Sequence, residues 1–384
     1  MCASAIDPKT TVLIADDSAF MRASLKRMIE SDDELRVIGT ADNGLEALAK
    51  INSLCPDVVT LDIDMPGMDG FEILKRVMSD LPRPIIIVSS IARGGAKATL
   101  EALDLGAFDC VAKSLNYGTE DVMKVQEELV SKIKAAAAAG ARWDAAIVPT
   151  TVLATVPAIA AAATGHSRTS SLSRQVHGTG KRAAAVSPSI IAIGTSTGGP
   201  KALQTILSVM PESLPVPIVI VQHMPTGFIE PLAARLNLLS RLEVHEAREG
   251  EHLQPGHAYL APTGRHLTFL RLNQREVIIH LSPLPGDLAH IPSINVMMMS
   301  AAQVFQSATM GIILSGMGDD GADGMQAIFR HGGYTLGQDR ASCVVYGMPR
   351  ACHDRGVLSE MVPLTDIASR ILREVGSSSF VTAH

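Results

Sequence analysis

Thr11-Val-Leu-Ile-Ala-Asp-Asp-Ser18 joins a short aliphatic run to two adjacent acids. Because β-branched and aliphatic residues are enriched in buried strands, the run Thr11–Ala15 predicts a strand. The next apolar side chains recur at helical spacing, at Met21, Leu25, Met28 and Ile29. This stretch therefore predicts a strand followed by an amphipathic helix, with the two acids at the carboxyl end of the strand.

The same alternation of strand and helix continues to about residue 139. The further strand candidates are Arg36–Thr40, Val58–Asp62, Ile85–Ser89 and Asp109–Ala112. Helical patterns follow them at Gly44–Leu54, Gly70–Ser79, Gly95–Gly106 and Asp121–Ala139. Five such units predict a parallel, doubly wound sheet, and we expect a flavodoxin-like α/β domain over residues 9–135.

Composition limits the functions that the 384-residue chain can have. The length allows two or three domains. A formal net charge of −6 argues against a nucleic-acid-binding protein, which needs a basic surface to displace counterions. The five cysteines are scattered and form no CxxC pair, which fits a reducing cytoplasm and no zinc site. We interpret Cys55 and Cys110 as small buried hydrophobic residues.

Residues 136–187 differ in composition from the rest of the chain. They are rich in Ala, Thr, Ser and Gly with scattered Pro, which is typical of a flexible linker, although a docking role stays open. The uncharged stretch Ala145–Gly165 is mostly alanine and is too weakly apolar for a membrane span. The N-terminus lacks the basic and apolar regions of a signal peptide. We therefore expect a cytoplasmic protein without membrane insertion.

A second α/β pattern occupies residues 188–384. Ser189–Gly194 predicts a strand that enters a glycine-rich turn, and Val216–Gln222 predicts a second buried strand. Another strand is predicted at Gly311–Leu314, and helices are predicted at Lys201–Met210, Ala301–Ser307 and Gly324–His331. The region from Glu249 to Ile294 is rich in proline and polar residues. We expect a doubly wound, mainly parallel sheet in this half as well.

Chemically active side chains lie at the ends of four strands in the first domain. Asp16 and Asp17 follow the first strand, Asp62 ends the third, Ser89 ends the fourth and Lys113 follows the fifth. These side chains should meet, because the carboxyl ends of parallel strands form the ligand crevice of such a sheet. The carboxylates would require a hard cation such as Mg²⁺, and the lysine could neutralise a phosphoryl group. The alternative for each acid alone is a helix N-cap or a loop residue.

The motifs around these residues resemble the receiver domains of two-component response regulators. They are Ile14–Ser18 (IADDS), Leu61–Gly70 (LDIDMPGMDG), Val88–Ser90 (VSS) and Ala112–Lys113 (AK). The resemblance implies a phospho-acceptor at Asp62 and a switch pair formed by Ser89 and Lys113. It also implies a Mg²⁺ site made of Asp16, Asp17, Asp62 and the backbone carbonyl of Asp64.

Gly194-Thr-Ser-Thr-Gly-Gly-Pro200 joins a predicted strand of the second domain to a helix. It lacks the G-x-G-x-x-G spacing of a Rossmann phosphate loop and the lysine of a P-loop. A strand–turn–helix junction can instead expose a serine among free backbone N–H groups, as in a nucleophile elbow, although the G-x-S-x-G spacing is only partly met. Ser196 is therefore a candidate nucleophile.

A serine nucleophile needs a base, and the base needs a residue that orients it. His223 follows the neighbouring predicted strand, so it can meet Ser196 at the same edge of the sheet. Asp320 lies in the turn after the strand Gly311–Leu314 and could hold the imidazole of His223. The alternative for His223 is a purely structural histidine. The alternatives for Asp320 are a turn or a calcium-binding loop, although the acidic spacing does not match an EF-hand.

The second domain resembles the catalytic domain of the chemotaxis methylesterase family of the CheB type. The matching motifs are Gly194–Pro200 (GTSTGGP), Gln222–Pro225 (QHMP), Ala261–Gly264 (APTG), Ser315–Gly324 (SGMGDDGADG) and Cys343–Arg350 (CVVYGMPR). The resemblance implies Ser196 as nucleophile, His223 as base and Asp320 as the orienting residue. It also implies that Thr197 supports this network and that the backbone N–H of Met317 helps to bind the oxyanion.

Together the two resemblances imply a protein-glutamate methylesterase that releases methanol from chemoreceptors, deamidates receptor glutamines and needs no cofactor for the esterase step. A sensor histidine kinase would phosphorylate the receiver, which otherwise covers Ser196. The family usually has Asp where this chain has Asn295, a departure outside the triad that we expect to matter little. A DNA-binding response regulator and an inactive receptor scaffold are the rival hypotheses. The negative charge and the Ser/His/Asp set argue against them.

Overall fold

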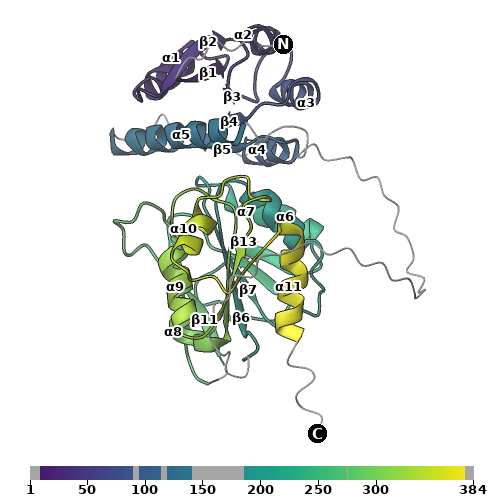
Figure 1. Ribbon diagram of the computed structural model, residues 1–384, viewed down its shortest axis with the longest axis vertical. Helices are drawn as coiled ribbons and strands as arrows, with labels where there is room; N and C mark the ends of the chain where they lie inside the picture. Colours follow the sequence, from purple (N-terminus) through teal and green to yellow (C-terminus); the bar gives the residue numbers. More distant parts are fainter. Residues whose placement is uncertain (1–8, 90–94, 114–118, 141–185, 275, 377–384) are drawn as a thin grey trace, which may run out of the picture.

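The computed structural model describes residues 9–89, 95–113, 119–140, 186–274 and 276–376. Most of the predicted linker therefore lies outside the described residues. Two parallel sheets, one from each half of the chain, are the main features of the fold (Figure 1). Within the described ranges, no helix combines the length and the apolar character that crossing a membrane requires.

The N-terminal sheet contains five parallel strands in the order β2-β1-β3-β4-β5. Strands and helices alternate as β1 (Thr10–Ala15), α1 (Ala19–Ile29), β2 (Leu35–Ala41), α2 (Gly44–Leu54), β3 (Val58–Leu61), α3 (Gly70–Asp80), β4 (Ile85–Ser89), α4 (Gly95–Asp104), β5 (Asp109–Ala112) and α5 (Thr119–Gly140). All five predicted strands are present, and β3 and β4 are buried throughout because helices cover both faces. The helix α5 continues past residue 135, where we placed the domain boundary.

Side chains just before three helices accept the backbone N–H groups that a helix start leaves unpaired. Ser18 caps α1, Asn43 caps α2 and Asp69 caps α3, each by accepting from the N–H three residues later. The cap of α1 is thus Ser18 and not one of the acids before it. The carboxylate of Asp16 instead accepts from the N–H of Ser18, at 2.9 Å. The N-cap alternative for Asp16 and Asp17 is therefore wrong.

The C-terminal sheet has seven parallel strands in the order β14-β13-β12-β6-β7-β9-β8. Its elements are β6 (Ile190–Thr195), α6 (Gly199–Leu207), β7 (Ile218–Gln222), α7 (Ile229–Leu239), β8 (Glu243–Glu246), β9 (His257–Leu260), α8 (Ile294–Phe305), β12 (Thr309–Ile313), α9 (Ala322–Arg330), β13 (Tyr334–Gln338), α10 (Met348–Asp354), β14 (Glu360–Val362) and α11 (Leu364–Gly376). Strands that follow β6 in the sequence lie on both of its sides, so the strand order reverses there. Such a reversal creates a crevice at the carboxyl ends of the strands.

The region from Glu249 to Ile294 contains more regular structure than its composition suggested. It includes β9 and an antiparallel pair, β10 (His266–Arg271) and β11 (Val277–Ser282). Buried side chains of this pair, such as Phe269 and Ile279, belong to the same apolar cluster as Met297 of α8. The pair therefore covers α8, the helix that begins beside the candidate catalytic residues.

The cysteines follow the expected pattern except at one position. Cys110 and Cys352 are buried free thiols, and burial raises the pKa of each to about 12. Cys343 is also free. Cys55 is disulfide-bonded and half-buried at the C-terminus of α2, where its φ is 49°. Its interpretation as a buried free thiol is therefore wrong, whereas that of Cys110 is confirmed.

The two halves share an interface formed by α4 and α5 on one side and by α6, α7 and the loops near β6 on the other (Figure 1). Leu100 of α4 joins the apolar cluster of the C-terminal sheet. Phe228, just before α7, is fully buried in a cluster of the N-terminal domain. Asp104 of α4 and Arg235 of α7 form an ion pair beside these contacts. The interface thus has an apolar core with a charged pair near it.

Candidate active site and phosphorylation site

The predicted acids and the lysine of the N-terminal domain meet at the carboxyl edge of its sheet. The Nζ atom of Lys113 lies 2.6 Å from Asp62 Oδ2 and 2.8 Å from Asp16 Oδ2. Oxygen atoms of Asp16, Asp17 and Asp62 all lie within 4.8 Å of one another. The backbone N–H of Asp64 donates to Asp62 Oδ1 at 3.3 Å. The parallel strand order thus brings together residues that are far apart in the sequence.

The charges in this cluster do not balance. Burial raises the pKa of Asp62, and the Lys113 ammonium offsets that effect only in part. Burial alone would lower the pKa of Lys113, but hydrogen bonds to Asp16 and Asp62 raise it. One ammonium therefore faces two buried carboxylates, with the exposed Asp17 beside them. A set of carboxylate oxygens with excess negative charge fits a hard divalent cation such as Mg²⁺.

The end of β4 is linked to the same edge. The backbone N–H of Lys113 donates to the carbonyl of Ser89 at 2.7 Å. The Ser89 side chain is buried, and its hydroxyl donates to the carbonyl of Gly95 at 3.4 Å. The two residues predicted as a switch pair thus lie at the ends of adjacent strands, next to Asp62.

Ser196 lies in the tight turn between β6 and α6. Its backbone N–H donates to the carbonyl of Ser315 at 3.1 Å. Gly198 has a φ of +81°, a conformation that glycine adopts without strain and that lets the chain turn into α6. A Cβ atom at Gly316 would come within 2.9 Å of Ser196 Cβ, so only glycine fits beside the serine. The half-buried Ser196 hydroxyl makes no hydrogen bond to a described residue.

His223 begins where β7 ends and connects the nucleophile turn to Asp320. Its backbone N–H donates to the carbonyl of Thr195, the residue before Ser196, at 3.0 Å. Its ring Nε2 lies 2.9 Å from Asp320 Oδ2. The other ring nitrogen, Nδ1, is buried and has no hydrogen-bond partner among the described residues. That nitrogen is available to take a proton from a neighbouring hydroxyl.

Asp320 is held at the N-terminus of α8. It accepts from the hydroxyl of Ser293 at 2.9 Å and from the backbone N–H groups of Ile294 at 2.8 Å and Asn295 at 3.0 Å. Burial alone would raise the pKa of Asp320, but these bonds and the bond with His223 lower it to about 2. A helix N-terminus also favours negative charge. The carboxylate therefore stays ionised and can orient and stabilise the imidazolium of His223.

The remaining predicted residues lie on the same side of the sheet. Thr197 is buried, and its carbonyl accepts from the hydroxyl of Ser315 at 2.8 Å. The backbone N–H of Met317 binds no acceptor in the described part of the chain. A cavity of about 450 Å³ opens beside Met317, His290 and Asp320. The site thus offers a space for a substrate next to the triad residues.

This arrangement can be compared with known proteins. Residues 191–371 match the CheB methylesterase family, and residues 12–123 match the response regulator receiver domain family. The protein-glutamate methylesterase/protein-glutamine glutaminase of Lawsonia intracellularis is 40% identical over 94% of this chain and 98% of that protein. The protein of the same name from Halalkalibacterium halodurans is 40% identical over 96% of this chain and 99% of its own length. The chain belongs to the CheB methylesterase family.

Solved structures of separate CheB domains are similar to the two halves. The catalytic domain of Thermotoga maritima CheB methylesterase is 37% identical, covers 49% of this chain and 99% of its own, and has a TM-score of 0.47. The response regulator domain of Thermotoga maritima CheB is 43% identical, covers 34% of this chain and 97% of its own, and has a TM-score of 0.31.

Several residues of the CheB site were not predicted. The side-chain nitrogen of Gln222 donates to the carbonyls of both Ser196 and His223, at 2.9 Å each, and so ties their backbones together. The side chain of Asn295 accepts from the N–H groups of Gly321 and Gly324, at 3.0 and 2.8 Å, and holds the turn that carries Asp320. The expectation that the departure at Asn295 matters little stays a prediction, because an Asp carboxylate oxygen could accept the same two bonds. The motif QHMP contained the signal for Gln222, but nothing in the sequence indicated the bonds of Asn295.

His290 is a third unpredicted residue near the candidate site. Its ring stacks on that of His223, with centroids 4.0 Å apart and planes 20° apart. The residue is exposed as a whole, but burial of its ring and the charge that His223 can carry lower the pKa of His290 to about 4. A neutral ring at neutral pH therefore restricts the orientation of His223 without adding a charge.

The receiver contacts this site directly. Asp109 at the start of β5 accepts a short hydrogen bond from the hydroxyl of Thr197, next to Ser196. Ser131 of α5 donates to the sulfur of Met317 at 3.2 Å. Lys132, one residue further, lies 3.3 Å from Asp109, so the same two receiver elements are joined above the site. In this conformation the candidate active site therefore faces α5.

Proposed function

We propose that this protein hydrolyses γ-methyl esters of glutamate side chains on chemoreceptors, and deamidates receptor glutamines, under the control of receiver phosphorylation. The observation that carries the proposal is the largely buried His223–Asp320 pair, whose histidine is bonded through its backbone to Thr195, the residue before Ser196, in a chain of this family. The names of the relatives supply the reacting groups, glutamate methyl esters and glutamines of proteins, and the family resemblance supplies chemoreceptors as their carriers. An ester and a primary amide pass through similar tetrahedral intermediates, so one site can serve both reactions.

In the proposed mechanism, Ser196 attacks the ester carbonyl while Nδ1 of His223 takes its proton. Asp320 holds the imidazole and stabilises the imidazolium. The backbone N–H of Met317 stabilises the oxyanion, and Thr197 supports the turn. His223 returns the proton to the leaving methoxide, which departs as methanol. Water then attacks the acyl-enzyme, His223 takes a proton from the water and returns it to the oxygen of Ser196, and the glutamate is released. No cofactor takes part.

The receiver would accept a phosphoryl group on Asp62 from a sensor histidine kinase. The carboxylates of Asp16, Asp17 and Asp62, with the backbone carbonyl of Asp64, would hold Mg²⁺. The cation would neutralise charge on the phosphoryl oxygens. The ammonium of Lys113 would exchange its contact with the free Asp62 carboxylate for one with the phosphoryl group, and Ser89 would follow as its partner in the switch.

We further propose that the resting receiver keeps substrate away from Ser196. Contacts from Asp109 to Thr197 and from Ser131 to Met317 support this reading, since both receiver residues lie on elements next to the switch. Phosphorylation would favour an open arrangement in which those contacts are lost. The proposed units are a receiver at 9–135, a linker at 136–187 and a catalytic domain at 188–384. The expected partners are the cytoplasmic domains of methyl-accepting receptors, and the protein itself would be cytoplasmic and bind no nucleic acid.

Methanol release from membranes that contain methylated chemoreceptors tests the proposal. The full-length protein should release methanol slowly alone and faster with Mg²⁺ and a small-molecule phosphodonor. Receptors with glutamine at the same positions should release ammonia. A protein that releases neither product, with or without the phosphodonor, would support the scaffold hypothesis instead.

A further inference from the structure

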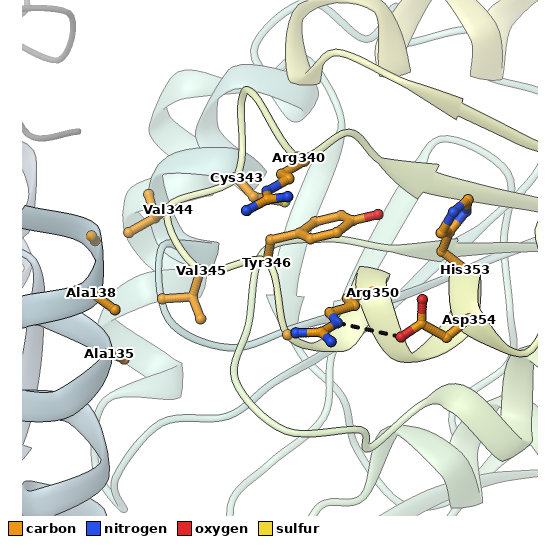
Figure 2. A pocket seen from close by; sticks show the side chains of 12 residues that line it. Ala135, Ala138, Arg340, Cys343, Val344, Val345, Tyr346, Arg350, His353 and Asp354 are labelled. Atoms are coloured by element: carbon orange, nitrogen blue, oxygen red, sulfur yellow. Dashed lines mark hydrogen bonds and ion pairs between the residues drawn. The ribbon is translucent and has the colours of Figure 1, made fainter. Parts of the chain in front are cut away.

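A second cavity, of about 680 Å³, lies at the seam between the receiver and the catalytic domain (Figure 2). One wall is the last part of α5, which contributes Ala135, Ala138 and Ala139. The other wall is the segment 340–354, which contributes charged side chains and Tyr346. The space exists because alanine side chains are too short to fill it.

The cavity adjoins the active site. The backbone N–H of Gly347 donates to the carbonyl of Gly316, and that of Gly316 donates to the carbonyl of Val345, both at 3.0 Å. Gly316 precedes Met317, whose N–H faces the candidate substrate. The wall of the cavity is therefore joined to the segment that would bind the oxyanion.

Two arginines and one acid, Arg340, Arg350 and Asp354, line the cavity, so its net charge is positive. Figure 2 shows the ring of Tyr346 between the side chains of Arg340 and Arg350. Arg340 is exposed and forms no ion pair with a described acid. Arg350 pairs with Asp354 at 3.3 Å, but both side chains are more than half exposed, so this pair is weak and screened. His353 also lines the cavity.

The position of α5 shows that a helix fits over this surface. Ser131 contacts Met317, and Ala135 and Ala138 lie over the cavity. These positions are spaced i, i+4 and i+7, so they share one face of the helix. This face of α5 presents no carboxylate to the arginines at Ala135, Ala138 or Ala139. A substrate helix in the same place could present carboxylates there.

We propose that the basic cleft, defined by Arg340, Arg350 and His353, binds acidic side chains that lie one and two helical turns from the reacting glutamate of a protein substrate. This inference rests on the proposed function. One turn of helix rises about 5.4 Å, so acids at i+4 and i+7 lie on the same face as the reacting residue. A guanidinium matches a carboxylate in shape and charge. The resting receiver covers the cleft with α5, so recognition and catalysis are blocked together.

The test compares three substrates with the full-length protein in the presence of Mg²⁺ and acetyl phosphate. One is a helical peptide with a single glutamate γ-methyl ester and glutamates at the i+4 and i+7 positions. The second peptide has alanine at both positions, and the third substrate is an uncharged ester, N-acetylglutamate γ-methyl ester N-methylamide. The variants are Arg340→Gln, Arg350→Gln and the double variant. Arg330→Gln, at the exposed end of α9, is the matched control.

Each single variant should raise KM for the acidic peptide about 3- to 5-fold, and the double variant about 10-fold, with kcat unchanged. High salt should shrink the difference. The alanine peptide, the uncharged ester and the control variant should show no change. An equal loss on all three substrates would indicate damage to the catalytic site and overturn the proposal. Equal KM values for the two peptides with the wild-type protein would overturn it as well, without reliance on any variant.

Binding of the fluorescein-labelled acidic peptide, measured in parallel, separates this proposal from the proposed function. If wild-type protein binds the peptide more tightly than the double variant does but releases no methanol from any substrate, the cleft is supported and the esterase function fails. If methanol is released and binding is the same in both proteins, the cleft proposal fails and the esterase function stands.

Discussion

Asp320 contacts more of the active site than any other triad residue. It binds His223, the hydroxyl of Ser293 and two backbone N–H groups at the start of α8. Ser196, in contrast, makes contacts only through its backbone within the described residues. The two residues should therefore respond differently to substitution: loss of the serine hydroxyl should affect the chemistry alone, and loss of the carboxylate should also affect stability.

Ser196→Ala should leave a folded protein with methanol release reduced by about 10⁴-fold or more, because no other nucleophile is in place. Its melting temperature should match that of the wild type. Ser208→Ala, at the exposed end of α6, is the control. Methanol release near the wild-type rate from Ser196→Ala would mean that another group attacks the ester.

Asp320→Asn tests the low pKa of this carboxyl, which is about 2 against an ordinary value of 3.8. A folded-state pKa below the unfolded one stabilises the protein at higher pH, and this contribution is lost as the pH falls toward the folded pKa. The free energy of unfolding of the wild type should exceed that of the variant at pH 5. The difference should shrink by on the order of 2 kcal/mol as the pH approaches 2.

Denaturant titrations at several pH values measure that difference. Asp323→Asn is a matched control, since Asp323 is an exposed acid in the first turn of α9, three residues after Asp320, and pairs with Arg355. A difference between wild type and Asp320→Asn that stays constant from pH 5 to pH 3 would mean that the carboxyl titrates normally in the folded protein.

Asp62→Asn should abolish labelling by a small-molecule phosphodonor in Mg²⁺, because an amide cannot form an acyl phosphate. The folded protein should tolerate the change, since Asn keeps the shape of the side chain. Asp80→Asn, at the exposed end of α3, should be labelled like the wild type. Unchanged labelling of Asp62→Asn would identify a different acceptor.

Whether the sequence could predict the role of a residue depends on which part of the structure fixes its position. Ser196, His223 and Asp320 could be predicted because they follow strands, and the sheet brings strand ends together. Asn295 could not, because its bonds to Gly321 and Gly324 form only once α8 lies beside the turn after β12. The stacking of His290 on His223 is likewise a product of tertiary structure. Residues that position others through distant contacts leave little local signal.

The strands also differed in how clearly the sequence predicted them. All five receiver strands were predicted from their apolar runs, and β3 and β4 are buried throughout, although the edge strand β2 is only partly buried. In β11, buried and partly exposed residues alternate, and its neighbouring segments are rich in proline and polar residues. The alternation in Val277–Ser282 was present in the sequence, but it was not read as a strand because the surrounding region is rich in proline and polar residues. Burial on one face gives a weaker signal than burial on both.

The contact between α4 and α7 yields a prediction about inhibition. Asp104→Asn removes the ion pair with Arg235 and should destabilise the closed arrangement. A partly exposed pair contributes up to about 1 kcal/mol, so methanol release by the unphosphorylated protein should rise up to about 5-fold. The rate of the fully phosphorylated protein should not change.

Arg76→Gln is the control for that experiment. It removes the Arg76–Glu72 pair on α3. This pair is exposed, and α3 is not one of the receiver helices that form the interface. Its resting rate should equal that of the wild type. If Asp104→Asn instead leaves the resting rate unchanged and lowers the phosphorylated rate, the α4–α7 contact supports catalysis and does not inhibit it.

In the molecule as a whole, the helices α4 and α5 lie between the two sheets (Figure 1). The catalytic half has its own apolar clusters, one on each face of its sheet, and the cluster that contains Met297 and Phe269 has no receiver residue among those described. Phe228 is different, because its burial depends on the receiver. Separation of the halves should therefore leave the catalytic core intact and expose a limited apolar surface.

A fragment of residues 188–384 should fold alone and should release methanol faster than the unphosphorylated full-length protein. A covering domain lowers apparent activity by the fraction of time for which the site is closed, and the fragment has no such cover. The fragment should also ignore the phosphodonor. The full-length Asp62→Asn variant is the matched comparison, since it too ignores the phosphodonor but keeps the receiver in place. If the fragment is slower than that variant, occlusion is wrong, and the receiver must supply contacts that the catalytic domain needs for activity.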